Sequence, residues 1–189
     1  MKRFAALLLP LCLAVENSAQ AVQPPPADTR CSISLGSHTV DYGALSRWQL
    51  RDSEAGSRHV TFGKRTLMLS VICPSSQPLV LRLNGERSAK GDLRYGERGW
   101  LAIRVLEANL DGKSVQVVSS RPDGVIEGAA SDSLTLQPGQ VFAPGVNGQV
   151  AKGQSFTARV EIEPMLSAEA ARVGSLTTSE ARFNLQLVR

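Results

Sequence analysis

Phe156-Thr-Ala-Arg-Val-Glu-Ile-Glu163 is the stretch of sequence that decides the fold class. Its apolar side chains recur at every second position, and polar or charged side chains occupy the positions between them. Successive side chains of an extended strand point to opposite faces of a sheet. The alternation therefore predicts a strand with one face in a core and the other in water.

The same alternation recurs on both sides of this stretch. Later in the chain, Phe183, Leu185 and Leu187 alternate with polar residues. Because a period of two dominates from Cys31 onward, we predict an all-β domain. The earlier runs with the same pattern are Cys31–Leu35, Leu67–Cys73, Leu79–Leu83, Leu101–Val105 and Val115–Val117.

Dipeptides that favour turns separate the runs, as expected of short strands joined by tight connections. Short strands with this punctuation favour a β-sandwich. We also predict one short helix at Ser167–Gly174, which Ser167 would cap and Gly174 would end. The turn dipeptides are Asn84-Gly85, Asp111-Gly112, Asp123-Gly124, Pro138-Gly139 and Asn147-Gly148.

The first 21 residues (1–21) have the three parts of a signal peptide. Lys2 and Arg3 precede an apolar stretch that is too short to span a membrane, and Ala19-Gln20-Ala21 is a typical cleavage site. Cleavage would leave a short proline-rich segment, 22–30, and one domain, 31–189. We therefore expect the protein to be exported.

Export bears on the cysteines. Of the three in the chain, Cys12 would leave with the signal peptide. Cys31 and Cys73 would remain in an oxidising compartment, where they form the one possible disulfide. Each lies on the apolar face of its predicted strand, so both side chains should point inward, as a bridge between neighbouring strands requires.

No arrangement of residues typical of a catalytic or metal site is recognisable. The chain has two histidines, His38 and His59, and they do not belong to a close cluster of metal-ligand types. Nothing resembles the G-x-S-x-G motif of a nucleophilic serine. We therefore expect no enzyme activity, no metal and no cofactor.

The formal net charge is +4, and the densest basic cluster runs from Arg47 to Arg65. This cluster could face a polyanion, but a solvated loop is the favoured interpretation. Aromatic residues do not interleave with it as they do on single-strand nucleic-acid platforms, so we expect no nucleic-acid partner. The aromatic residues that could stack on a sugar are Trp48, Trp100, Tyr42 and Tyr95, although such residues are more often found in a core or at its rim.

Four segments stand in a recognisable order and spacing. Together they resemble the pilin domains of chaperone–usher fimbriae, and the resemblance covers nearly the whole mature chain. The segments are Cys31-Ser-Ile-Ser-Leu35, Val40-Asp-Tyr-Gly43, Leu67-Met-Leu-Ser-Val-Ile-Cys73 and Phe183-Asn-Leu-Gln-Leu-Val188.

The resemblance implies an immunoglobulin-like β-sandwich that lacks its final strand and is completed by donor-strand complementation. A periplasmic pilus chaperone would fill the groove, and an adjacent pilus subunit would replace the chaperone at the outer-membrane usher. The carboxylate of Arg189 would bind basic residues of the chaperone. The resemblance also implies export through the periplasm to the cell-surface fimbrium. The residues expected to line the groove are Ile33, Leu35, Phe183, Leu185 and Leu187.

Two functions remain open from the sequence. The first is a structural pilus subunit. Since segment 22–30 contains Pro24-Pro25-Pro26 and only one large apolar residue, Val22, it should not donate a strand. That would place the subunit at the tip, as a tip subunit or as a tip adhesin with a host or surface receptor. The second is a free-standing periplasmic or secreted β-sandwich whose loops bind a ligand.

Overall fold

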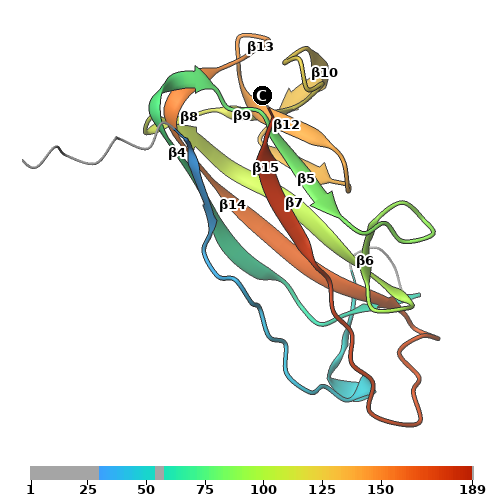
Figure 1. Ribbon diagram of the computed structural model, residues 1–189. Coiled ribbons are helices and arrows are strands. Elements are labelled where there is room, and N and C mark those ends of the chain that lie inside the picture. The colour runs from blue at the N-terminus through green and yellow to red at the C-terminus, as the bar shows by residue number, and fades with distance from the viewer. Residues whose placement is uncertain (1–29, 54–57, 189) are drawn as a thin grey trace, which may run out of the picture.

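The structure is a computed structural model, and it describes residues 30–53 and 58–188. The predicted signal peptide, residues 22–29 of the proline-rich segment and Arg189 lie outside the described residues. The described chain folds into two antiparallel sheets, as the alternating sequence pattern predicts (Figure 1).

The first sheet is built around one long strand, β14. One side of β14 pairs with β4 and then with β3, and its other side pairs with β7. Beyond β4 lies β1, beyond β3 lies β2, and β7 also pairs with β6, β8 and β11. The bounds are β1 Ser32–Leu35, β2 Arg51–Asp52, β3 His59–Thr61, β4 Arg65–Pro78, β6 Leu93–Tyr95, β7 Gly99–Leu110, β8 Lys113–Ser114, β11 Ser133–Leu136 and β14 Lys152–Ser167.

The second sheet has the order β10-β9-β12-β5-β15, and β13 pairs with one end of β12. A short 3-10 helix, η1 (Arg47–Gln49), precedes β2 in the chain. The bounds of the strands are β5 Leu81–Gly85, β9 Gln116–Ser120, β10 Ile126–Ser131, β12 Val141–Val146, β13 Gln149–Val150 and β15 Phe183–Leu187.

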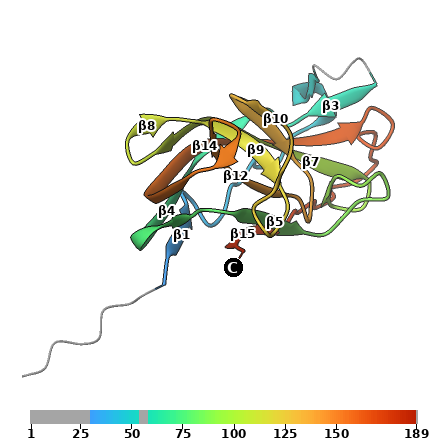
Figure 2. The same cartoon turned by 90° about the horizontal axis from the view of Figure 1, so that it is seen from above.

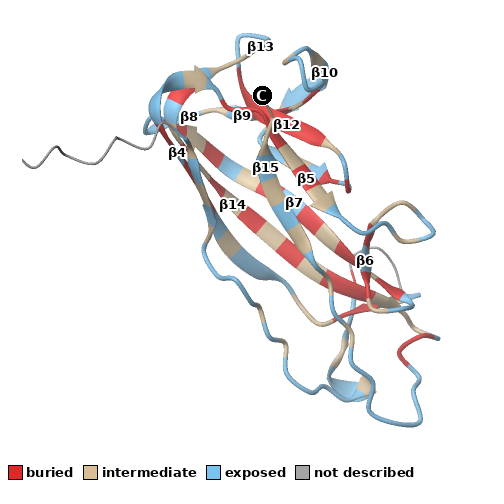
Figure 3. Cartoon of the chain, in the orientation of Figure 1, coloured by how far each residue is buried: buried red, intermediate tan, exposed pale blue. Residues whose placement is uncertain are grey.

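The main core lies between the two sheets. Buried residues alternate with more exposed ones along most of β7 and β14, which gives these strands the striped appearance in Figure 3. Phe156 of β14 and Phe142 of β12 belong to the same core and are both fully buried. Since the two sheets enclose one apolar core, the architecture is a β-sandwich.

A second, smaller apolar cluster covers part of the outer face of the second sheet. Val118 and Val141 are buried in it, while their neighbours Val117 and Phe142 point into the main core. Strands β9 and β12 are therefore apolar on both faces at this point.

Four of the five predicted turns are present. Asp111-Gly112 and Asn147-Gly148 have positive φ at both residues, as tight hairpin turns require. The prediction of a turn at Asn84-Gly85 is wrong, because both residues belong to β5 and pair with β15.

The helix predicted at Ser167–Gly174 is also wrong. β14 continues to Ser167, which pairs with His59 of β3. The chain then makes a single turn, in which the Ser167 Oγ accepts a hydrogen bond from the Ala170 N–H at 3.0 Å. Ser167 thus bonds the backbone three residues on, as a helix cap would, but no helix follows it in the described part of the chain.

Candidate functional site

Each sheet ends in an edge strand on the same side of the sandwich. β1 is the last strand of the first sheet, and β15 is the last strand of the second. Figures 1 and 2 show β1 and β15 facing each other on this side, with no described strand between them. We call the side bounded by β1 and β15 the open edge.

The open edge is apolar toward the interior. All five residues that the sequence predicted to line a groove are half-buried and pack against the main core. The residues between them are exposed and polar, so the two strands present the same alternation. The apolar residues are Ile33 and Leu35 of β1, and Phe183, Leu185 and Leu187 of β15.

The backbone of β1 directs hydrogen-bonding groups away from its sheet. In β14, Ser155 donates its N–H to the Asp111 carboxylate and accepts the Asp111 N–H, both at 2.8 Å. The backbone N–H and C=O of Ser155 therefore point away from its β4 partner, Ile72. The N–H and C=O of Ile72 point to the other side, toward Ser32 of β1. Backbone direction alternates along a strand, so Ile33 and every second residue from it point their N–H and C=O to the open edge.

The backbone of β15 has the same orientation. Leu83 of β5 donates its N–H to the Gln140 carbonyl at 3.0 Å and accepts the Gly139 N–H at 2.6 Å. Both groups of Leu83 thus face away from its β15 partner, Leu185. In an antiparallel pair, Leu185 must then turn its N–H and C=O to the open edge.

The open edge therefore combines two features on the same residues. Apolar side chains at alternate positions point into the sandwich, and the backbone groups of the same residues point to the space between β1 and β15. This arrangement can hydrogen-bond an extended segment along each strand, with the alternate side chains of that segment on the apolar side of β1 and β15.

A disulfide joins β1 to its only partner strand among the described residues. Cys31 immediately precedes β1, Cys73 is a buried residue of β4, and their Cα atoms are 4.1 Å apart. This is the pair expected from the sequence. Since the bridge links neighbouring strands of one sheet, it fixes the start of β1 and leaves its open side accessible.

The segment from Val40 to Gly43 follows β1 and packs near Phe62 and Arg65, where β3 ends and β4 begins. The Asp41 carboxylate accepts the Gly43 N–H at 2.7 Å, which forms a local turn. The Tyr42 ring contacts Phe62 edge-on with centroids 6.1 Å apart, and the Arg65 guanidinium lies 5.5 Å from the Tyr42 centroid. Burial raises the pKa of Tyr42 to about 12, although the positive charge of Arg65 acts in the opposite direction.

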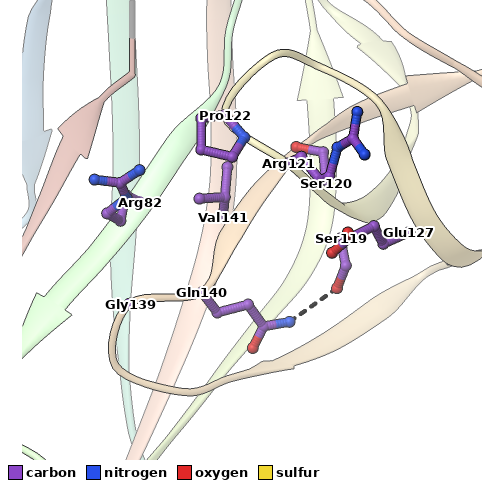
Figure 4. Close-up of a pocket in the computed structure, with 9 residues that line it drawn as sticks. All are labelled: Arg82, Ser119, Ser120, Arg121, Pro122, Glu127, Gly139, Gln140 and Val141. Carbon is purple, nitrogen blue, oxygen red and sulfur yellow. Dashed lines mark hydrogen bonds between the residues drawn. The ribbon is translucent and has the colours of Figure 1, made fainter.

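A pocket of about 300 Å³ lies on the second sheet, and none of its lining residues belongs to β1 or β15. Figure 4 shows its Gln140 side chain turned toward Ser119, to whose Oγ it donates a hydrogen bond at 2.8 Å. The neighbouring Ser120 Oγ is buried without a hydrogen-bond partner in the structure. Sequence reasoning missed this pocket because Arg82, Ser119 and Gln140 come from three separate segments with no common motif.

The described residues contain neither a metal-ligand cluster nor a membrane-spanning helix. Within residues 30–53 and 58–188, no group of three or more His, Cys, Asp and Glu side chains is placed to hold a metal ion. No helix in the same ranges is long and apolar enough to cross a membrane. The predicted contact at Arg189 lies outside the described residues.

The strand pairing and the shared core define the class of this protein as a two-sheet antiparallel β-sandwich. No protein-family model matches the chain, and no curated protein matches its sequence. Four chains of solved structures match it. One is described as the crystal structure of the P pilus rod subunit PapA. It is 20% identical, with a TM-score of 0.33, and the match covers 83% of this chain and 98% of that chain.

Proposed function

We propose that this protein is a structural subunit of a chaperone–usher pilus, exported through the periplasm to the cell-surface fimbrium. The observation that carries the proposal is the open edge. There, two strands from opposite sheets turn backbone groups toward the space between them, while the alternate apolar side chains of the same strands pack against the main core. An exposed edge of this kind promotes aggregation unless another strand covers it.

In this proposal, the covering strand comes from other proteins. A periplasmic chaperone supplies it first, with the carboxylate of Arg189 bound by basic chaperone residues, and an adjacent subunit supplies it at the outer-membrane usher. The sequence constellation from Cys31 to Val188 supports these partners. The open edge has a binding role rather than a catalytic one, since the side chains that it presents are apolar.

A pair of substitutions on one strand tests this proposal. Leu185→Asp places a charge on the interior face of β15, whereas Gln186→Asp places the same charge on the exposed face. An unpaired charge among apolar side chains costs roughly 2–4 kcal/mol. We therefore expect Leu185→Asp to lose co-purification with an immunoglobulin-like chaperone and to fall in periplasmic level, while Gln186→Asp keeps both.

Two results would count against the proposal. If the Leu185→Asp variant co-purified normally with the chaperone, the open edge would not be the chaperone-binding site. A wild-type protein that is monomeric, soluble and stable without a chaperone would favour a free-standing secreted binding domain instead.

We further propose that the subunit sits at the pilus tip, where it could also be adhesive. Segment 22–30 supports this position by its composition, because three prolines lack the N–H groups that a donated strand needs. A subunit that accepts a strand but does not donate one can occupy only the distal end of a fibre.

A further inference from the structure

Trp48 is exposed to an unusual degree. Its side chain is 93% exposed at the centre of η1. The other tryptophan, Trp100, is half-buried, and its ring contacts His59 edge-on at 4.9 Å and Lys90 at 5.6 Å. An indole ring is among the largest apolar surfaces that a side chain can present, so leaving it in water forgoes stabilisation that burial would give.

The turn that carries Trp48 is well defined. Gln49 donates its N–H to the Ser46 carbonyl at 3.0 Å, and its side-chain Oε1 accepts the Ser46 N–H at 2.8 Å. After η1 the chain enters β2, in which Arg51 pairs with Thr61 of β3. Trp48 is therefore held on an ordered turn, and η1 lies at the opposite end of the molecule from β10 and β13 (Figure 1).

The charges around Trp48 are mainly positive. Arg47 directly precedes it, and the exposed Arg51 follows three positions later. Neither arginine forms an ion pair with any residue in the described ranges. The exposed Asp52 is the nearest acidic residue along the described chain, so two arginines and one aspartate lie within four positions of Trp48.

We propose that Trp48, Arg47 and Arg51 bind an acidic polysaccharide. The indole stacks on the apolar face of one sugar ring, and the two guanidinium groups pair with carboxylate or sulfate groups on the same or the next unit. A flat exposed ring suits a flat partner such as the face of a sugar ring. This inference does not depend on strand acceptance at the open edge.

Calorimetric titration of the whole mature protein tests the proposal with defined polymers. Polygalacturonate carries carboxylates, heparin carries sulfates, and dextran is uncharged. We expect at least one acidic polymer to bind and dextran not to bind, with affinity falling as salt rises, because salt screens the exposed charge of Arg51. Trp48 fluorescence should change on binding.

Matched variants identify the residues. Trp48→Ala should weaken binding about tenfold, Trp48→Phe less, and Arg51→Glu at least as much as Trp48→Ala. Lys113→Glu makes the same charge change as Arg51→Glu, but in β8 at the other end of the molecule, and should leave affinity within about twofold. Unchanged thermal midpoints and unchanged chaperone capture would show that these variants fold and keep the open edge.

The proposal is overturned by any of four results. These are no binding of either acidic polymer, equal binding of dextran, an unchanged affinity of the Trp48→Ala variant, and tighter binding to phosphatidylglycerol vesicles than to the polymers. The last result would identify an anionic membrane surface as the partner.

Discussion

Tyr42 links local packing to a measurable pH dependence. Burial raises the pKa of Tyr42 to about 12 and also raises the pKa of Tyr95, the only other tyrosine of the chain. A raised pKa means that the folded protein holds the phenolic proton more tightly than the unfolded chain does. The raised pKa values contribute to the free energy of unfolding in full below about pH 10, and this contribution is lost as the pH rises toward 12.

We therefore expect the free energy of unfolding to fall between pH 10 and pH 12, and to fall less steeply in the Tyr42→Phe variant. In absorbance titrations at alkaline pH, the folded protein should ionise its tyrosines later than the denatured protein does. Ionisation of both tyrosines near pH 10 in the folded protein would contradict this account.

The disulfide provides the second prediction at the scale of single residues. Cys31 and Cys73 are 42 positions apart in the sequence, and a cross-link of that length contributes roughly 4 kcal/mol in the chain-entropy model. Replacing both cysteines by serine should therefore lower the denaturant midpoint and the periplasmic yield sharply. Two thiols that react with an alkylating reagent in native protein would show that the bridge does not form.

At the scale of elements, Gly99 sets how closely β6, β7 and β14 approach. A Cβ atom at this position would lie 2.7 Å from the Met165 carbonyl and 2.8 Å from the Tyr95 carbonyl, so backbone would have to move. We expect Gly99→Ala to destabilise the domain by roughly 1–3 kcal/mol in chemical denaturation. Gly174→Ala is the matched control, because a Cβ there would meet nothing within 4 Å; equal midpoints for the two variants would contradict the prediction.

The sequence was informative about strands that have one apolar face. β1, β4, β7, β14 and β15 all follow the period of two, and each is present. The sequence was uninformative about β12, since Val141 and Phe142 are both buried, in different clusters, and no alternation results. β10 lacks alternation for the opposite reason, because most of its residues are exposed.

Long-range pairing accounts for the error at Asn84-Gly85. The dipeptide favours a turn locally, but pairing with β15 extends β5 through both residues. At the open edge, too, local sequence pattern and long-range topology contribute different information. Alternation identified Ile33 and Leu185 as inward-facing, but only the topology places their strands on one side of the sandwich and orients their backbone groups.

At the scale of the whole molecule, the proposed tip position predicts where the protein lies on a fibre. Immunogold labelling of intact pili with antibodies against the folded domain should mark fibre ends in few copies. Label along the whole shaft would refute the tip assignment. N-terminal sequencing of the mature protein provides the control. The tip assignment assumes that segment 22–30 precedes Cys31 and cannot donate a strand. A different mature N-terminus would remove that assumption.

The pairing of β5 with β15 has a consequence for the time course of folding. Asn84 and Asn184 form a side-chain hydrogen bond across these strands although they are 100 positions apart. During synthesis, residues 81–85 therefore precede the strand that shields them by about 100 positions, and closing so large a loop is slow compared with forming a local hairpin. Until β15 pairs with β5, that side of β5 is unprotected. The most vulnerable form of this protein is thus the incomplete chain, and a helper that acts early would protect it more than one that acts on the finished domain.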